Sequence, residues 1–225
     1  MVERDPAFKP VVDAFGPPVL RQPEEGPFAA LVRAITFQQL AGRAAMAIHG
    51  RFVANFAGAI GPKAVLALPE AAFRAAGLSG SKAASIRDLA AKATDGTVPL
   101  DSLEALEDDE IVERLSAVRG IGPWTAEMFL IFQLGRTDVW PVDDFGVRKG
   151  WSTTHRLKEP ITPRALQAEG ERFRPYRSIA AWYCWRAVDT VLPVSADSAR
   201  LSPKVPNSRP RGARLAPKVR NSRRS

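Results

Sequence analysis

Apolar residues at helical spacing, running from Phe28 to Leu192, constrain the fold more than any other feature of this sequence. Leu31 and Ile35 continue one such face, and the segment 124–134 is apolar nearly all round, as expected for a central buried helix. The strict alternation typical of β-strands is nearly absent, and no Pro/Gly-rich linker divides residues 28–192. The sequence therefore predicts an all-α fold, a helical bundle of two interleaved lobes.

Several helix ends can be predicted from capping residues. Pro69 falls in a first turn and Gly77 follows the last turn of the same helix. Ser81 can cap the next helix, and Thr162 followed by Pro163 starts another.

The composition limits the class of protein. Of the 225 residues, 45% are hydrophobic, which is ample for a packed core. Cys184 is the single cysteine, so intramolecular disulfides, thiolate zinc sites and four-cysteine clusters are excluded. The two histidines are far apart in sequence, so we expect neither a side-chain metal site nor a cofactor. Without a run of 18 apolar residues or a secretory signal, we expect no membrane partner and a cytoplasmic, nucleoid-associated location.

The net charge of +8 resides in the C-terminal tail. Residues 194–225 hold nine Lys/Arg and one acid, which leaves 23 basic and 23 acidic residues in the rest of the chain. The tail repeats "ARLSPKVPNSR" as "ARLAPKVRNSR" and lacks aromatics, so we expect it to be disordered. Its role is open between a solubilising extension and non-specific phosphate attraction. We divide the chain into an N-terminal extension with little regular structure (1–25), a helical domain (26–193) and this tail (194–225).

The stretch "VRGIGPW" (118–124) lies between two predicted helices. Gly120 and Gly122 permit unusual backbone angles and leave the amides uncovered, and Pro123 suits a helix start. Uncovered amides at a helix N-terminus form a seat for phosphate. The alternative is an ordinary helix-to-helix turn, which also favours glycine.

The acid pair in "PVDD" opens another predicted helix. Asp143 can cap this helix, and Asp144 then occupies its first turn, where the helix dipole favours the ionised form. The alternative is that both are helix-start residues without a chemical role.

Taken together, "LSAVRGIGPWTAEMFLIFQL", "DVWPVDD", "FAALVRAITFQQLAGRAAMAI" and "PYRSIAAWYCWRAVD" resemble the helix-hairpin-helix (HhH-GPD) DNA glycosylase superfamily. The DNA-3-methyladenine glycosylase II type is the most similar branch, over residues 26–193, with the hairpin at 118–123. The resemblance places the essential aspartate of the family on Asp144. It places Trp124 where members that also cut the strand have a lysine, which implies a monofunctional enzyme without lyase activity. The β domain that often precedes the bacterial type is not expected here.

The resemblance also implies roles for other residues. Trp124 and Phe37 are expected to line the substrate pocket, where an indole can stack on a cationic alkylated base. Gln39, our first choice, or Leu40 is expected to fill the space left by the flipped base. Gly120, Gly122 and Thr125 are expected to bind DNA, and main-chain carbonyls near Ser116, Val118 and Gly122 to hold a monovalent cation. Weaker candidates are Trp140, Tyr176, Trp182 and Trp185 for the pocket and Arg119, Arg148 and Arg177 for phosphates.

We therefore expect a monomeric DNA glycosylase of base excision repair that acts on damaged double-stranded DNA. It would flip out an alkylated base of the 3-methyladenine type and hydrolyse the N-glycosidic bond to leave an abasic site. Two alternatives remain at this stage. One is a glycosylase of the same fold for uracil, hypoxanthine or mismatched bases, and the other is a non-catalytic helix-hairpin-helix DNA-binding module.

Overall fold

The computed structural model describes residues 1–18 and 23–188, and every regular element in these ranges is helical. The elements are η1 (Pro6–Phe8), α1 (Lys9–Phe15), α2 (Pro27–Phe37), α3 (Gly42–Val53), α4 (Pro62–Ala67), α5 (Glu70–Ala76), α6 (Gly80–Thr94), η2 (Leu103–Ala105), α7 (Asp108–Ser116), α8 (Pro123–Phe132), α9 (Phe145–Thr154), α10 (Pro163–Gly170), η3 (Glu171–Phe173) and α11 (Arg177–Ala187). The predicted all-α class is confirmed. The tail 194–225 and the last residues of the helical segment expected up to Leu192 lie outside the described residues.

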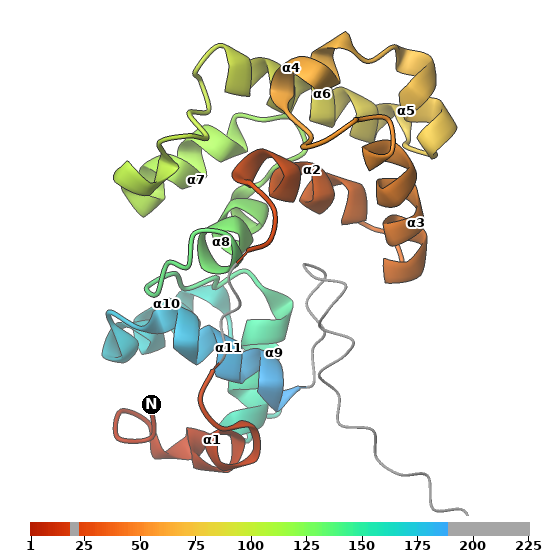
Figure 1. The fold of residues 1–225 in the computed structure, drawn as a ribbon. Helices are drawn as coiled ribbons and strands as arrows, with labels where there is room; N and C mark the ends of the chain where they lie inside the picture. Colours follow the sequence, from red (N-terminus) through yellow and green to blue (C-terminus); the bar gives the residue numbers. More distant parts are fainter. Residues whose placement is uncertain (19–22, 189–225) are drawn as a thin grey trace, which may run out of the picture.

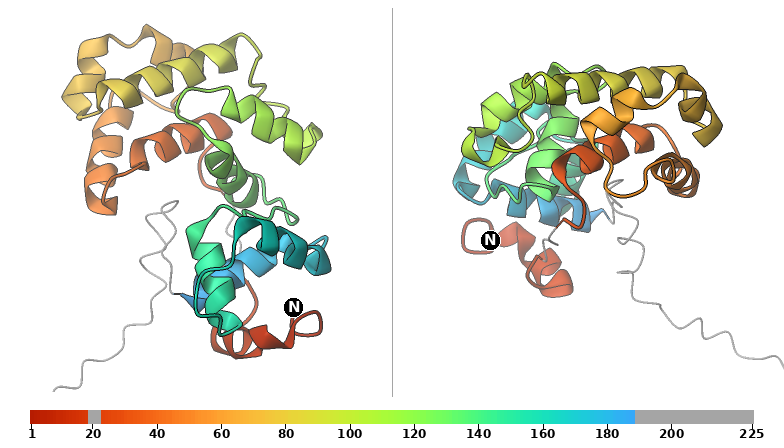
Figure 2. Two further views of the ribbon diagram at one scale, coloured as in Figure 1. Left: turned by 180° about the vertical axis from the view of Figure 1, so that it is seen from behind. Right: turned by 45° about the horizontal axis from the view of Figure 1, so that its top comes forward.

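Helices α2–α7 form one lobe, and α9–α11 together with α1 form the other (Figure 1). Helix α8 runs between them, and the two lobes stay distinct when the molecule is seen from behind (Figure 2). Six of the ten residues of α8 are buried: Thr125, Ala126, Met128, Phe129, Leu130 and Ile131. A helix that is apolar on most sides is stable only between packed neighbours, so α8 is the shared core element of both lobes.

The N-terminal segment belongs to the second lobe. Our expectation of little regular structure before residue 26 is wrong, because η1 and α1 are helical and α1 packs on α11. Phe8 is fully buried against the rings of Trp151 and Phe173. Asp5 caps η1 and accepts a hydrogen bond from the His155 ring at 2.9 Å. This segment has only weak sequence signals for a helix. It is helical because its apolar residues are buried against helices that lie far away in the sequence.

Two of the helix ends predicted from capping residues are confirmed. Gly77 ends α5 in the left-handed conformation at φ 92°, and Thr162 Oγ1 accepts from the amide of Ala165 at the start of α10. The prediction for Ser81 is wrong, because Ser79 adopts the extended conformation and its side chain caps α6. Pro69 likewise lies one position earlier than expected, as the N-cap of α5.

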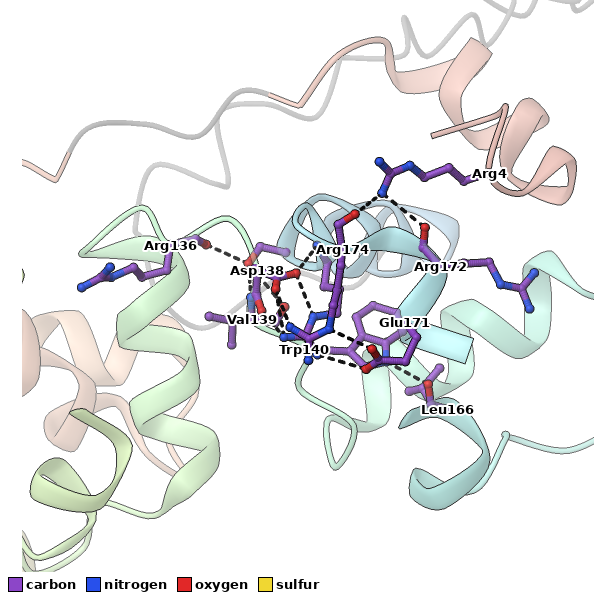
Figure 3. A network of polar contacts seen from close by, with 11 residues as sticks. Arg4, Arg136, Asp138, Val139, Trp140, Leu166, Glu171, Arg172 and Arg174 are labelled. Atoms are coloured by element: carbon purple, nitrogen blue, oxygen red, sulfur yellow. Dashed lines mark hydrogen bonds and ion pairs between the residues drawn. The ribbon is translucent and has the colours of Figure 1, made fainter. Parts of the chain in front are cut away.

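A polar network ties the segment before α9 to the start of α11 (Figure 3). Asp138 accepts hydrogen bonds from the guanidinium groups of Arg174 and Arg177 at 2.9 and 2.8 Å. Trp140 donates its indole N–H to the carbonyl of Leu166 at 2.9 Å (Figure 3). Burial raises the pKa of Asp138, but the paired guanidinium groups lower it, and the net effect is a lowered pKa. The carboxylate therefore stays ionised, and its ion pairs fix the segment that leads to Asp144.

No helix within residues 1–18 and 23–188 combines the length and the hydropathy that a bilayer-spanning helix needs.

Candidate active site

The carboxyl group of Asp144 lies at the start of α9 and is held by three N–H donors. Oδ1 accepts from the amide of Val147 at 2.7 Å and from the indole of Trp185 at 2.8 Å. Oδ2 accepts from the indole of Trp124 at 2.7 Å. Only 8% of the residue is exposed. Because an ionised carboxylate can only accept hydrogen bonds, this set of donors is complementary to the charged form.

Three helices meet at this carboxylate. Trp124 comes from the first turn of α8, Trp185 from α11, and Asp144 from the N-terminus of α9. The Trp185 ring also packs against Phe132 of α8, with centroids 5.7 Å apart. A carboxylate offers about four lone-pair positions, of which the three donors use three, two on Oδ1 and one on Oδ2. Within the part of the chain that the structure describes, the second lone pair of Oδ2 therefore has no protein donor.

The division of roles within the acid pair differs from the prediction. Asp144, and not Asp143, is the N-cap of α9, with an extended backbone at φ −67° and ψ 118°. Asp143 is exposed in the turn before it. Helix α9 begins one residue later than expected, because the Asp144 side chain reaches the amide of Val147 and satisfies one of the free N–H groups of the first turn. One carboxylate thus serves as both cap and candidate chemical group.

Glu127 of α8 adds a third carboxyl group that the sequence analysis missed. It lies three residues after Trp124, so the two side chains share one face of α8. Burial raises the pKa of Glu127 to about 7, and the negative charges of Asp143 and Asp144 add to this effect. A single acid within the apolar "WTAEMFLIF" segment was the available signal. At neutral pH about half of the Glu127 side chains therefore hold a proton that an ordinary glutamate would release.

Replacing Glu127 with glutamine is expected to change how stability depends on pH. The folded-state pKa of Glu127, about 7, lies above the ordinary value of 4.5. In the parent, the contribution of protonated Glu127 to the free energy of unfolding is therefore complete below pH 4.5 and is lost as the pH rises through 7. The variant lacks this loss, and above pH 7 it should be more stable than the parent by roughly 2 kcal/mol, a value discounted for partial exposure. Urea unfolding at pH 5 and pH 8 measures the difference.

Glu113→Gln is the matched control, because Glu113 is exposed on α7. Its stability should follow the parent at both pH values. Parallel pH profiles for the parent and the Glu127 variant would contradict the shifted pKa.

The hairpin before α8 contains Gly120 and Gly122. Gly120 has φ 77°, and a Cβ added there would lie 2.7 Å from Ser85 Oγ, so only glycine fits. Gly122 differs from our expectation, because its φ of −100° is open to any residue and nothing surrounds a Cβ placed there. Among residues 1–18 and 23–188, no side chain caps the first turn of α8. The N-terminal amides of α8 thus point outward at a helix dipole, as an anion site requires.

The predicted wedge residues project from the turn between α2 and α3. Gln39 is exposed and has φ 56°, a left-handed conformation that is uncommon for a residue with a side chain. Leu40 is 39% exposed, which is high for a leucine. Both side chains are accessible, and the choice between them stays a prediction.

Other predicted pocket residues fall into buried and exposed groups. Trp140 and Trp185 are core residues, and Trp182 packs edge-on against Tyr183 at 5.0 Å. Tyr176 is exposed. Phe37 is buried, with its ring 6.1 Å from His49, and its place in the substrate pocket stays a prediction.

Of the three arginines predicted to bind phosphate, Arg148 and Arg177 have side-chain partners within the protein, whereas Arg119 is bonded through its backbone amide. Arg177 is ion-paired with Asp138, and Arg148 donates to the carbonyl of Ile161 at 2.7 Å. The amide of Arg119 donates to Asp88. The Arg177 guanidinium is largely buried in its ion pair, so its predicted contact with the DNA backbone gains no support from the geometry and stays a prediction.

A hollow in the first lobe lies away from Asp144. Its volume is about 1000 Å³. It is lined by the segment before α2, by α2, by α3 and by the loop after α6, including Glu25, Phe28 and His49. Burial lowers the pKa of His49, so its ring is neutral at physiological pH. Neither Trp124 nor Asp144 borders this hollow, and the chemistry is therefore argued from the carboxylate and its donors.

Within the described ranges, no three His, Cys, Asp or Glu side chains converge as metal ligands. The monovalent cation expected at the hairpin would bind carbonyls instead. Those of Val118 and Gly122 already accept from the amides of Ile121 and Ala126, and each retains a second lone pair. The cation stays a prediction.

Residues 32–175 match the model of the HhH-GPD superfamily base excision DNA repair protein. The chain is 37% identical over 163 residues to DNA-3-methyladenine glycosylase 1 of Schizosaccharomyces pombe, covering 71% of this chain and 72% of the relative. The solved structure of a 3-methyladenine DNA glycosylase from the same yeast, in complex with abasic DNA, is similar with a TM-score of 0.72 and 33% identity, covering 84% of this chain and 94% of that one. A DNA-3-methyladenine glycosidase from Bacillus halodurans gives a TM-score of 0.77 and 34% identity, covering 84% and 87%.

Proposed function

The chain belongs to the HhH-GPD superfamily of base excision DNA repair proteins, and we propose that it is a monofunctional DNA glycosylase that releases alkylated bases of the 3-methyladenine type. The observation that carries the proposal is the Asp144 carboxylate, fixed by two indole N–H groups and one amide, with a lone pair free on Oδ2. We further propose that it acts as a cytoplasmic, nucleoid-associated monomer on double-stranded DNA.

The reaction places demands on this carboxylate that its surroundings meet. As the N-glycosidic bond breaks, positive charge develops on the sugar, and a fixed carboxylate in a site of low polarity stabilises that charge. An alkylated purine already carries a positive charge and leaves as a neutral base. Oδ2 can also orient or deprotonate the water that attacks the sugar. The products are a free base and an abasic site.

Trp124 supports the monofunctional assignment. Strand cleavage through a Schiff base requires an amine nucleophile, and an indole has none. Its N–H is committed to Asp144 Oδ2, so this residue fixes the carboxylate. Its ring face remains suited to stacking on a cationic base.

The DNA contacts complete the proposal. Gly120, Gly122 and Thr125 would bind a phosphate through backbone amides, because the Thr125 side chain is buried and none of the described side chains caps the first turn of α8. Gln39 or Leu40 would enter the base stack when the damaged base is extruded.

The experiment is a base-release assay on duplex oligonucleotides that carry 3-methyladenine, hypoxanthine, uracil or oxidised guanine. We expect free 3-methyladenine and abasic sites that break only after alkali, without a borohydride-trapped covalent complex. Strand cleavage without alkali would contradict the monofunctional assignment. Release of uracil or hypoxanthine alone would support the alternative substrate class. Absence of released base from every duplex would leave a DNA-binding module.

A further inference from the structure

The wedge segment, defined here as residues 38–40, is anchored by Lys82 of α6. Lys82 Nζ donates to the carbonyls of Thr36 and Gln38 at 2.5 and 2.7 Å. Both carbonyls belong to the end of α2, where the helix leaves acceptors without intrahelical donors. An ammonium group there satisfies these acceptors and interacts favourably with the helix dipole. Partial burial lowers the pKa of Lys82.

The same helix contacts the hairpin. Ser85, one turn after Lys82, lies so close to Gly120 that a Cβ on that glycine would meet its hydroxyl at 2.7 Å. Asp88, a further turn along, accepts from the amide of Arg119 at 2.7 Å. Lys92 forms an ion pair with Asp88 at 2.6 Å and keeps the carboxylate in place. The residues at positions 82, 85 and 88 therefore form a strip along α6 that touches the wedge segment and the hairpin in turn.

A direct hydrogen bond also joins the wedge segment to the hairpin. Gln38 Nε2 donates to the carbonyl of Gly120 at 2.9 Å, across 82 positions in the sequence. Gln39, the next residue, is held at φ 56°. A strained backbone of this kind persists only where neighbouring contacts fix it. Here the hydrogen bonds made by the Gln38 side chain and by Lys82 fix the residue directly before Gln39.

From these contacts we propose that Lys82 is a positioning residue for base flipping, because α6 fixes the spacing between the wedge segment and the phosphate-binding hairpin. The inference rests on the proposed function and extends it. The wedge can displace a base only if the DNA backbone is fixed relative to the wedge. In the proposed function the hairpin binds the DNA backbone and so fixes it. With both features fixed to one helix, insertion of the wedge and binding of the phosphate act on the duplex as one rigid unit.

The test compares a lesion that must be flipped with one that is already unpaired. Single-turnover release of 3-methyladenine is measured from a duplex in which it pairs with thymine and from one in which it lies opposite an abasic-site analogue. Lys82→Met should lower the rate on the paired lesion by about tenfold, because two charge-assisted bonds to the wedge segment are lost. The unpaired lesion should be released within about twofold of the parent rate, since little flipping work remains.

Two further variants sharpen the comparison. Lys82→Arg should restore most of the paired rate, because a guanidinium can donate to both carbonyls. Gln38→Leu, which breaks the direct bond to Gly120 and leaves α6 intact, should reproduce the selective loss. Lys63→Met is the matched control, since Lys63 is exposed on α4. Equal losses on both duplexes, as a general folding defect would give, would overturn the proposal.

A binding measurement separates this inference from the proposed function. If the parent protein releases no base, the proposed function fails, and the wedge is then probed on a duplex with a tetrahydrofuran abasic analogue opposite 2-aminopurine. Wedge entry should change the fluorescence with the parent protein and with Lys63→Met, and the change should shrink several-fold with Lys82→Met at saturating protein. The same change with Lys82→Met, or none with the parent, would overturn the inference.

Discussion

Asp144→Asn is expected to lower base release by about a hundredfold to ten-thousandfold while DNA binding is retained. The substitution removes the negative charge that stabilises the sugar cation. In the parent, the two carboxylate oxygens of Asp144 accept three N–H groups, whereas asparagine has a single acceptor oxygen. Its NH2 group would therefore face an N–H donor, that of Trp124 or Trp185. Single-turnover kinetics on the 3-methyladenine duplex measures the loss, and a gel-shift titration with an abasic analogue measures binding.

Asp143→Asn is the control for this experiment. It changes the charge by the same amount at the neighbouring position, but Asp143 is exposed and lies outside the set of indole donors. Release by this variant should stay within a few-fold of the parent. Asparagine caps helices about as well as aspartate, so α9 should remain folded in the Asp144 variant, which thermal unfolding verifies. Near-normal turnover by Asp144→Asn would remove this residue from the mechanism.

Gly150→Ala is expected to produce the largest loss of stability, at least about 3 kcal/mol. A Cβ at Gly150 of α9 would lie 1.9 Å from the carbonyl oxygen and 2.4 Å from the carbonyl carbon of Cys184 in α11. These are backbone atoms, so no side chain can rotate away, and the two helices must separate. Because α9 begins at Asp144 and α11 carries Trp185, base release should fall as well. Urea unfolding measures the change in stability.

The matched control is Gly50→Ala in the middle of α3. Nothing lies within 4 Å of a Cβ at Gly50, and alanine is the better helix former. This variant should be unchanged or stabilised by about 0.5–1 kcal/mol. If Gly150→Ala unfolded within about 1 kcal/mol of the parent, the close approach of α9 and α11 would not be the constraint described.

Much of the fold could be predicted from local patterns. Helical spacing identified the segments that become α2 and α8, and the turn residues Gly77 and Thr162 marked two ends correctly. The helical N-terminal segment was missed, because α1 is short and owes its place to burial on α11 and to the aromatic contacts of Phe8. Helix starts at Ser79 and Asp144 were misplaced by one or two residues, since neighbouring polar residues can serve equally as caps until the tertiary fold selects one.

Asp144 was chosen through the resemblance to the glycosylase family, and its role stays a prediction. The sequence by itself determined the helical class and the hairpin with Gly120. These properties depend on residues close together in the chain, whose spacing acts through local geometry. The tertiary structure alone decided that Trp124 and Trp185, 20 and 41 positions away, donate to the same carboxylate. It also decided that Glu127 keeps a proton near pH 7 and that Lys82 holds the wedge segment. Donor partners and burial depend on which helix faces meet, and the periodicity of a single helix does not encode that choice.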